Sequence, residues 1–482
     1  MLSRVSARGT QRIAAWITTS LLLGGCAGEP VESAPAPDPI VAEAGFVDVP
    51  PRDVTVNGQP VSIAARARLF YNLRPADDHP EDKPILVLFN GFAAEVVRSF
   101  GTGPTTVAEG GDVVDNPWSL TKVANLLYVE PRQSGYSYDV IADRKPTWND
   151  CFPAIFNEYV DAADVLFGVL SFLDSHPRLK GPVHWVGESY AGVRIQWLLA
   201  YLRGRWDLAP YQDKALEQAL EGAPKDRPLA ASQILLQPWL LGAAHAAAIQ
   251  GVCGSEDTIA KVSASTGADC TGLNACACAN DAGRSLYNYV YTDEHQRKRE
   301  FEASEAHTVP ERAAALLGVE LTKVDGLAAP DRRKGFKCDQ ADSETPPEDD
   351  LVKLLGALQT GQSYYLGYAP LQPGKEIADF TPDWRAKNLI GAAFVDNLRD
   401  VPTFVTDGPL DLVVPTSALA PGLEALLGPD HVDASAGLSV VTADGARAIE
   451  IHRYPSAGHM ITMLEPEAFS KDVAAWLASP KP

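Results

Sequence analysis

The sequence is short of positive charge and of histidine. Its 482 residues include 41 Lys and Arg against 62 Asp and Glu, for a formal net charge of -21 at pH 7. Because phosphate backbones are bound by basic surfaces, this balance argues against a nucleic-acid partner. With only nine histidines, the chain offers few candidates for a catalytic base. The length allows a large catalytic domain with an insertion.

The N-terminus lacks an apolar run long enough for a membrane-spanning helix, which takes roughly 20 residues. Three arginines within residues 1–12 precede a short apolar stretch, residues 13–25, and then Cys26. This layout predicts a secretory signal peptide over residues 1–25. Residues 23–26, LGGC, resemble the lipobox of bacterial lipoproteins, which implies a lipidated Cys26 and a cell-envelope location, in the outer membrane or facing the periplasm. An ordinary signal peptide with an incidental cysteine is the alternative.

A Pro/Ala-rich tether of residues 26–45 follows the signal, and the folded part is expected from Phe46. Six further cysteines occur at positions 151, 253, 270, 276, 278 and 338. An even count in an exported chain predicts three disulfides, with 15 pairings left open. A metal site on Cys276 and Cys278 is the alternative, and it is disfavoured because no histidine lies close to them in sequence.

Short apolar runs alternate with helical patterns along most of the chain. Strands are predicted at 83–91, 125–131, 182–186, 401–407 and 449–455, and helices at 161–176 and 465–479. This alternation predicts an α/β protein built on a central sheet. The rhythm is lost in the middle of the chain, where most cysteines lie. We therefore expect a core of residues 46–240 and 386–482, interrupted by a disulfide-rich cap or insertion over 241–385.

The segment GESYAG, residues 187–192, places a serine between an apolar strand and a helical run. A nucleophile elbow is such a turn, and it projects its serine from a strained backbone. Glycines relieve the crowding of strand against helix, and Gly187 and Gly192 flank Ser189. A tight packing turn with an incidental serine is the alternative. In a nucleophile elbow, the backbone N–H of Tyr190 would point into an oxyanion hole.

A nucleophilic serine needs a base and an acid that orients the base. His459 lies between the last predicted strand and the last helix, and Asp411 follows the strand at 401–407. The order Ser189, Asp411, His459 is that of α/β-hydrolases. Asp407 is the rival for the acid.

These residues together resemble the serine carboxypeptidase family. GESYAG matches its nucleophile signature and AGHM, residues 457–460, its histidine motif. GPLDLVVPT, residues 408–416, resembles its aspartate motif, although Pro409 stands where the family has a first acid. The stretch 115–138 also matches. The resemblance implies an α/β-hydrolase fold, a mostly parallel sheet flanked by helices, with no metal or organic cofactor. It also implies an acyl-enzyme mechanism that releases C-terminal residues from peptides.

The family's oxyanion loop reads Asn-Gly-Gly-Pro-Gly, whereas residues 90–94 read NGFAA. By position, the N–H of Phe92 is the second oxyanion donor beside that of Tyr190. The family binds a substrate carboxylate through this loop and through the glutamate of GESY. The resemblance therefore assigns Asn90, Gly91 and Glu188 to carboxylate binding.

A second family glutamate aligns with Gly101, and Glu95 is a substitute from a different point of the loop. The sequence thus predicts a serine hydrolase of carboxypeptidase type that acts on a peptide or ester. An esterase or acyltransferase on the same fold is the alternative, and an inactive binding lipoprotein is a third interpretation. Membrane contact is expected through the N-terminal lipid anchor alone.

Overall fold

The structure is a computed structural model in which two compact units, Met1–Pro39 and Ile40–Pro482, are distinguished. It describes residues 39–89, 91, 101–108, 112–141, 144, 147, 150, 157–240, 250–285, 288–292, 310–325, 327, 335–336, 389–412, 414–415, 419–428, 432–433, 439–441 and 447–479. The predicted signal peptide and Cys26 lie outside the described residues.

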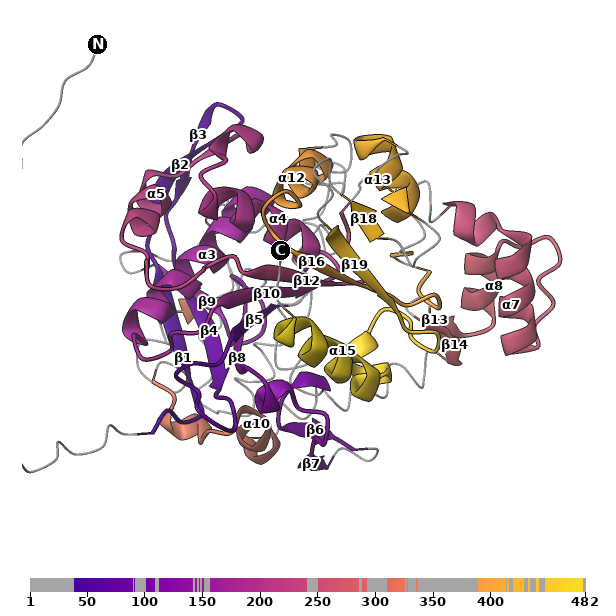
Figure 1. Ribbon diagram of the computed structural model, residues 1–482, viewed down its shortest axis with the longest axis horizontal. Helices are drawn as coiled ribbons and strands as arrows, with labels where there is room; N and C mark the ends of the chain where they lie inside the picture. The colour runs from indigo at the N-terminus through magenta and orange to yellow at the C-terminus, as the bar shows by residue number, and fades with distance from the viewer. Residues whose placement is uncertain are drawn as a thin grey trace, which may run out of the picture. The chain divides into compact units, whose positions relative to one another are not determined.

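A mixed sheet forms the centre of the fold and has twelve strands among the described residues (Figure 1). Its strands are β1 (Glu43–Val49), β4 (Arg66–Arg74), β5 (Ile85–Phe89), β8 (Asn125–Val129), β9 (Tyr138–Val140), β10 (Val183–Glu188), β12 (Ser232–Leu236), β15 (Gly335–Phe336), β16 (Thr403–Asp407), β17 (Val432–Asp433), β18 (Ser439–Val441) and β19 (Arg447–Arg453). The order is β15-β9-β4-β8-β5-β10-β12-β16-β19-β18-β17, with β1 paired to β4.

The middle of this sheet is parallel and its edges are antiparallel. Strands β8, β5, β10, β12, β16 and β19 pair in parallel, whereas β1, β4 and β9 on one side and β18 and β17 on the other are antiparallel. Strands β5, β8, β10 and β12 are buried along their whole length, as parallel strands covered on both faces must be. Every strand predicted from the sequence is confirmed. The predicted strands are β5, β8, β10, β16 and β19, whereas β12 and the strands β1, β4, β9, β15, β17 and β18 were not predicted.

Helices cover both faces of the sheet. They are α3 (Glu158–Ser175), α4 (Ala191–Leu202), α5 (Lys214–Glu221), α12 (Leu389–Asn397), α13 (Leu419–Leu427), α14 (Ile461–Leu464) and α15 (Pro466–Ala478). Along β5, Val87 belongs to the buried cluster shared with α3 and α4, while Leu88 belongs to the cluster on the α15 side. Neighbouring strand residues point to opposite faces, so one apolar strand contributes to both layers.

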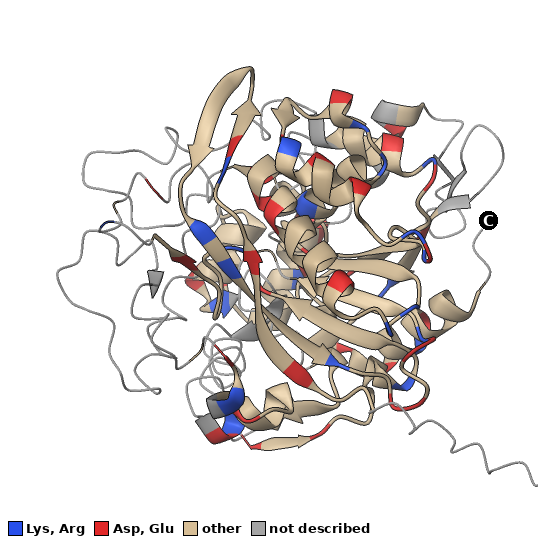
Figure 2. Cartoon of the chain, turned by 90° about the vertical axis from the view of Figure 1, so that its left-hand side faces the viewer, with Lys and Arg blue, Asp and Glu red and all other residues tan. Residues whose placement is uncertain are grey.

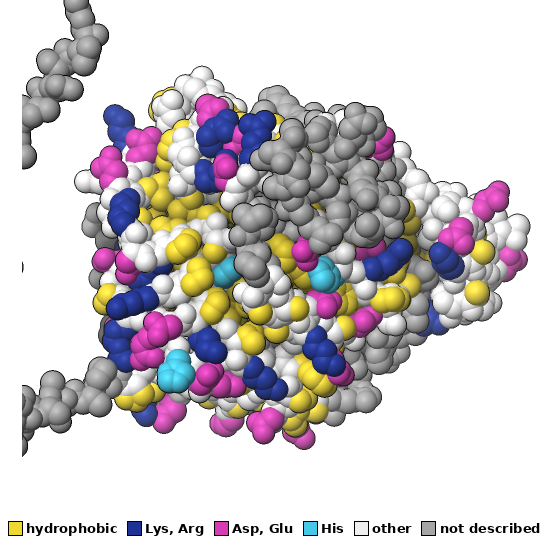
Figure 3. Space-filling view, viewed as in Figure 1, with side chains coloured by type: hydrophobic (Ala, Val, Ile, Leu, Met, Phe, Trp, Pro, Cys, Tyr) yellow, Lys and Arg dark blue, Asp and Glu magenta, His cyan; other side chains and the backbone are white. Residues whose placement is uncertain are grey.

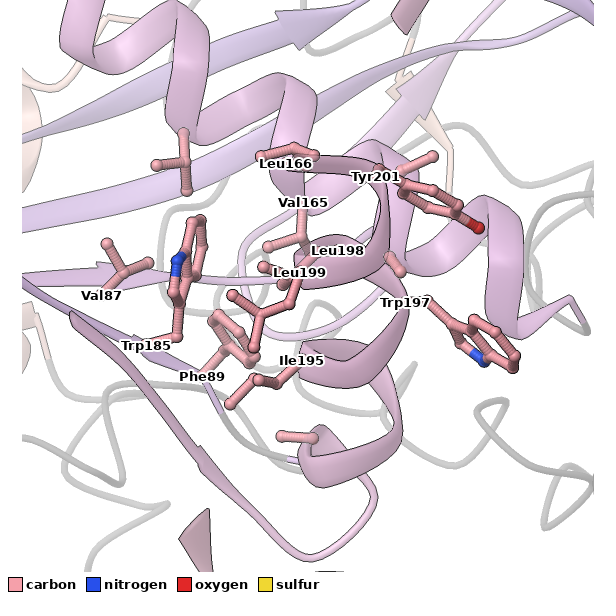
Figure 4. Close-up of a cluster of buried hydrophobic side chains, with 14 of the residues drawn as sticks. Val87, Phe89, Val165, Leu166, Trp185, Ile195, Trp197, Leu198, Leu199 and Tyr201 are labelled. Carbon is pink, nitrogen blue, oxygen red and sulfur yellow. The ribbon is translucent and has the colours of Figure 1, made fainter. Parts of the chain in front are cut away.

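Helix α4 packs on the sheet directly behind the elbow. Figure 4 shows Ile195 and Leu199 of α4 facing Phe89 and Trp185 of the sheet. Helix α3, predicted at 161–176, packs beside α4. It begins after Asn157, whose side chain accepts the N–H groups of Tyr159 and Val160. The serine-bearing turn thus joins a buried strand to a helix that is buried over most of its length.

The described part of the predicted cap contains several short elements. They are α7 (Glu256–Thr266), α8 (Ala275–Asp281), β13 (Arg284–Ser285), β14 (Asn288–Thr292), α10 (Pro310–Leu317) and η3 (Leu321–Lys323). Disulfides Cys253–Cys276 and Cys270–Cys278 join α7, α8 and their neighbouring turns, which confirms two of the three predicted bonds. Cys151 and Cys338 lie outside the described residues. The stapled pair α7–α8 appears at the right of Figure 1.

Smaller elements complete the described chain. These are β2 (Arg52–Val56) and β3 (Gln59–Ile63), which pair with each other, with β11 (Tyr211–Gln212) on β2; β6 (Thr105–Val107) with β7 (Val113–Asp115); η1 (Leu120–Lys122) and η2 (Trp206–Leu208). Acidic and basic residues are interspersed along the described chain and on the face seen in Figure 3 (Figures 2 and 3). Among the helices that the structure describes, none combines the length and apolar character needed to cross a bilayer.

Candidate active site

Ser189 occupies a strained turn between β10 and α4. Its φ is +59°, a left-handed value that residues with a Cβ rarely adopt. Two backbone hydrogen bonds hold this turn to the end of β12: Ser189 N donates to Leu236 O at 2.9 Å, and Trp239 N donates to Ser189 O at 3.0 Å. The strain is thus fixed by the neighbouring strand, as a nucleophile elbow requires.

The two glycines of the turn are explained by what a Cβ would meet there. A Cβ on Gly187 would come 2.8 Å from Ile195 Cδ1 and 2.9 Å from Ala191 Cβ, both on the following helix. A Cβ on Gly192 would lie 3.0 Å from Pro238 Cβ, after β12. Gly187 therefore lets helix α4 approach β10, and Gly192 lets it approach the end of β12. Both spacings serve the packing of the elbow.

The loop after β5 reaches the elbow at Gly91. A Cβ on this buried residue would lie 2.9 Å from Tyr190 N and 3.2 Å from Glu188 O. The predicted oxyanion donor Tyr190 and the predicted carboxylate-binding residues Gly91 and Glu188 are therefore brought together. A side chain at position 91 would crowd the Tyr190 N–H. Asn90 and Phe92, the other predicted residues of this loop, lie outside the described residues, as does Glu95.

Arg194 of α4 packs against Tyr190 of the elbow and Phe89 of β5. Its Nε donates to Asp161 Oδ2 at 2.8 Å in a fully buried ion pair. The guanidinium also lies 5.4 Å from the Phe89 ring centroid and 5.5 Å from that of Tyr190. Burial raises the pKa of the Tyr190 phenol well above its ordinary value, and the nearby carboxylate of Asp161 adds to this. The Tyr190 side chain is therefore neutral and fixed at neutral pH.

Asp411 and His459 are joined by a short hydrogen bond. The distance from His459 Nδ1 to Asp411 Oδ2 is 2.6 Å, and the two residues are 5% and 2% exposed. Their loops are also linked, because Leu410 N donates to Ala457 O at 3.2 Å. Nδ1–H bonded to a carboxylate leaves Nε2 as the basic nitrogen of the neutral ring. This pair is the base-and-acid arrangement that the sequence predicted.

The rival acid Asp407 lies elsewhere. Its Oδ2 is 3.4 Å from the guanidinium of Arg453 on β19, and its backbone oxygen accepts the Tyr454 N–H. Asp407 is therefore a partly exposed residue at the end of β16, and Asp411 is the carboxylate that orients His459.

Ser189, Asp411 and His459 follow the carboxyl ends of β10, β16 and β19, which lie in the order β10-β12-β16-β19. Ser189 is buried as well, at 3% exposure. In open α/β sheets this edge is where ligands bind. Within the described residues, no group of three His, Cys, Asp or Glu side chains could hold a metal ion. The arrangement supports proton transfer and nucleophilic attack by side chains.

The sequence did not single out Gln237, which follows β12 between the two halves of this site. Its buried carboxamide contacts Asp411, and Nε2 lies 3.1 Å from Asp411 Oδ2. One signal was present in the sequence: a polar residue directly after the apolar run ILL of residues 234–236. Because β12 itself was not predicted, this residue could not be placed at the active edge.

Gly101, where the family has a second glutamate, is packed against the histidine loop. A Cβ there would overlap the backbone carbonyl of Thr462 and lie 2.7 Å from Thr462 Cβ. The position therefore has no room for any side chain. The absence of a glutamate follows from the close packing of Gly101 against helix α14.

A second Ser–His contact lies at the amino ends of β10 and β12, opposite the edge that carries Ser189. Ser232 Oγ is 2.6 Å from His184 Nδ1 and accepts the indole N–H of Trp476 at 3.1 Å. Both residues stand near the starts of their strands, in register with each other. Ser232 is thus a buried structural serine on a regular strand and a matched control for Ser189.

Sequence comparisons match the part of the chain that contains the serine elbow. The serine carboxypeptidase family model matches residues 45–205. Serine carboxypeptidase-like 26 of Arabidopsis thaliana is 31% identical over 145 residues, which cover 27% of this chain and 29% of that protein. Serine carboxypeptidase S10 family member 1 of Dictyostelium discoideum is 29% identical over 138 residues, covering 27% and 31%. The matched segments thus span under a third of these relatives.

Among solved structures, a prohormone-processing carboxypeptidase from Saccharomyces cerevisiae superposes with a TM-score of 0.53 at 13% identity, covering 90% of each chain. At this identity the likeness concerns the fold. The described sheet, with its helices on both faces, has the α/β-hydrolase fold, and residues 45–205 are similar in sequence to the serine carboxypeptidases.

Proposed function

We propose that this protein is a serine hydrolase that forms an acyl-enzyme on Ser189 and releases C-terminal residues from peptides. The observation that carries the proposal is the 2.6 Å bond between His459 and Asp411, at the same sheet edge as the strained Ser189. The family similarity covers the elbow, which lies within the matched residues 45–205.

In the proposed reaction, His459 Nε2 takes the proton of Ser189 Oγ as the oxygen attacks the substrate carbonyl. Asp411 holds the imidazole through Nδ1 and stabilises its positive charge. The N–H of Tyr190 stabilises the oxyanion, with that of Phe92 as the second donor. His459 then protonates the leaving group and activates the water that cleaves the acyl-enzyme.

An esterase or acyltransferase is the second candidate, and the packing at Gly101 favours it. Two neighbouring carboxyl groups can share a proton and so bind a substrate carboxylate. Here Glu188 is buried beside Gly91, but position 101 cannot supply the second carboxyl group because Thr462 fills the space. In this reaction Ser189 takes the acyl group of an ester, and the alcohol that leaves is uncharged and carries no carboxylate.

The two candidates are separated by one experiment with mature protein lacking Cys26. A peptide with a free C-terminus, its C-terminal amide and a simple ester are each incubated with the enzyme at acid and neutral pH. Stepwise loss of single residues from the free acid alone identifies a carboxypeptidase. Cleavage of the ester with both peptides intact identifies the second candidate.

The matched controls are Ser189→Ala and Ser232→Ala, which remove the proposed nucleophile and a buried structural serine. A fluorophosphonate probe should label the native protein and Ser232→Ala but not Ser189→Ala. Absence of labelling in the native protein would overturn the proposal and favour an inactive binding protein.

We also propose that the chain is anchored to the bacterial cell envelope through a lipid on Cys26. The proposal rests on the signal-like residues 1–25 and the LGGC sequence that ends at Cys26. Labelled palmitate should be incorporated into the full chain expressed in a bacterium and not into Cys26→Ser. Equal incorporation in both would refute the anchor.

A further inference from the structure

Gln237 lies at the carboxyl end of β12, between the strand that carries Ser189 and the strand that precedes Asp411. The residue is fully buried and has a φ of +42°. Its backbone N–H donates to Thr406 Oγ1 of β16 at 3.1 Å. A large polar residue is therefore held in a strained conformation between the strands that carry the site, and such strained residues cluster at functional sites.

The orientation of the Gln237 carboxamide is determined by its neighbours. Oε1 accepts the backbone N–H of Gly408 at 2.7 Å, and that contact requires an oxygen. The NH₂ group must then face the other side. There it meets Asp411 Oδ2 at 3.1 Å, Gly408 O at 3.3 Å and Val414 O at 3.5 Å, which are all acceptors. One rotamer satisfies both ends of the amide.

The carboxylate of Asp411 is fixed in turn. Oδ2 accepts from both His459 Nδ1 and Gln237 Nε2, and Oδ1 accepts the backbone N–H of Val414 at 3.1 Å. A buried carboxylate is stabilised by such donors, and their directions set the plane in which it can bind the imidazole. Of these three donors, Gln237 and His459 donate from a side chain, so the Gln237 amide can be replaced without altering the backbone.

We propose that Gln237 is a positioning residue that orients the Asp411 carboxylate toward His459 and ties this pair to the serine elbow. The same short segment supplies both connections, because Leu236 O and Trp239 N hold the backbone of Ser189. Residues 236–239 therefore link the nucleophile with the acid across the sheet. This inference rests on the proposed function, since it concerns the same site.

Two substitutions separate positioning from mere packing. Gln237→Leu keeps the volume and removes the hydrogen bonds of the carboxamide to Gly408, Asp411 and Val414. Gln237→Glu keeps the shape, and its protonated form can still donate to Asp411 while accepting from Gly408. Once ionised, it places a second carboxylate against Asp411, which costs both groups their favourable ionisation. Among the described groups that contact the Gln237 carboxamide, Asp411 is the titratable one, and the others are backbone groups. His459 is hydrogen-bonded to Asp411, and Thr406 contacts the backbone N–H of Gln237.

The matched control is Gln233→Leu, on the same strand. Gln233 is also fully buried and bridges β12 to β16 through Thr403 Oγ1 at 2.8 Å, but it lies toward the start of the strand. Loss of a buried amide should lower the melting temperature of both leucine variants. Only Gln237→Leu should change the chemistry.

Ester hydrolysis by the folded variants is measured from pH 5 to 8. For Gln237→Leu we expect kcat to fall by about tenfold to a hundredfold with KM little changed, because misplacement of a catalytic group acts on the reaction step. For Gln237→Glu, the ratio of kcat to the native value should fall as the pH rises. Native-like kcat in both variants, or an equal loss in Gln233→Leu, would overturn the proposal.

A second measurement does not depend on turnover and keeps this test separate from that of the proposed function. The proton in the short His459–Asp411 bond gives a far-downfield proton NMR signal, identified by its loss in Asp411→Asn. Gln237→Leu should shift or broaden this signal, whereas Gln233→Leu should leave it in place. An unchanged signal in Gln237→Leu would refute the positioning role even if the native protein hydrolyses no substrate tried.

Discussion

Replacing Asp411 by asparagine tests the acid of the proposed triad with almost no change in shape. The carboxylate of Asp411 accepts hydrogen bonds at both oxygens, from Val414 N at Oδ1 and from Gln237 Nε2 and His459 Nδ1 at Oδ2. An asparagine has one acceptor and one NH₂ group, so it cannot serve both sides.

Either orientation of the introduced carboxamide carries a penalty that the contacts define. With NH₂ at the Oδ2 position, it faces the Gln237 amide and forces His459 to present Nδ1 as an acceptor. The proton of the ring then moves to Nε2, which can no longer accept the Ser189 proton. With NH₂ at the Oδ1 position, it faces the N–H of Val414. Because Gly408 N fixes the Gln237 amide, that side chain cannot flip to relieve the first conflict.

We expect Asp411→Asn to lower kcat by about 10⁴, the loss typical of a triad whose histidine is held in the wrong tautomer. The matched control is Asp407→Asn, which removes a partly exposed carboxylate beside Arg453 and should stay within about twofold of native activity. Turnover of an ester and the rate of fluorophosphonate labelling are measured together. A loss below tenfold in Asp411→Asn, or a larger loss in Asp407→Asn, would refute the assignment of the acid.

Three further outcomes follow from other contacts. Gly101→Ala should reduce the free energy of unfolding by about 1–3 kcal/mol, as overpacking does, because its Cβ would overlap the Thr462 carbonyl; an unchanged denaturation midpoint would contradict this. Leu412 is buried against Cys270 and Cys278 of the disulfide-linked α7–α8 pair and is the neighbour of Asp411 in the chain. Leu412→Ala should therefore lower kcat about tenfold, and reduction of both disulfides should also lower kcat. Full activity in both cases would disprove that the α7–α8 pair helps to position Asp411. His176 contacts the carboxylate of Glu43 at 2.5 Å; burial lowers its pKa, but this contact and a backbone carbonyl outweigh burial and raise the pKa overall. The ion pair therefore stabilises the fold fully below about pH 6.5, the ordinary pKa of histidine, and this stabilisation is lost as the pH rises through the raised pKa of His176. Glu43→Gln should abolish this loss of unfolding free energy with rising pH, measured by urea unfolding.

The parallel strands and the elbow could be predicted because local pattern determines them. The apolar runs around Val87 and Trp185 are buried on both faces, and the glycines beside Ser189 are required by contacts within a few residues or with the next strand. The acid and base could be proposed for another reason: the chain has only nine histidines, and the order Ser189, Asp411, His459 is that of α/β-hydrolases.

The rest depends on contacts between segments distant in sequence. Strand β12 has only five residues, two polar residues followed by three apolar ones, so no period separates it from a loop. Because β12 was not predicted, the sequence could not place Gln237 between β10 and β16. The conformation and partners of Gln237 come from residues 406–414, about 170 positions away, which no local pattern encodes.

The packing at Gly101 bears directly on which substrate the site can hold. If the missing glutamate were a simple substitution, Gly101→Glu would restore the carboxyl pair of the carboxypeptidases. The structure argues otherwise, since even a methyl group at position 101 overlaps the backbone of Thr462, three residues after His459. A glutamate there would displace the start of α14, which begins two residues after His459. If the protein cleaves peptides at a free C-terminus, Glu188 and the residues around Gly91 are left to bind the carboxylate, and the comparison of a free acid with its amide measures whether they suffice.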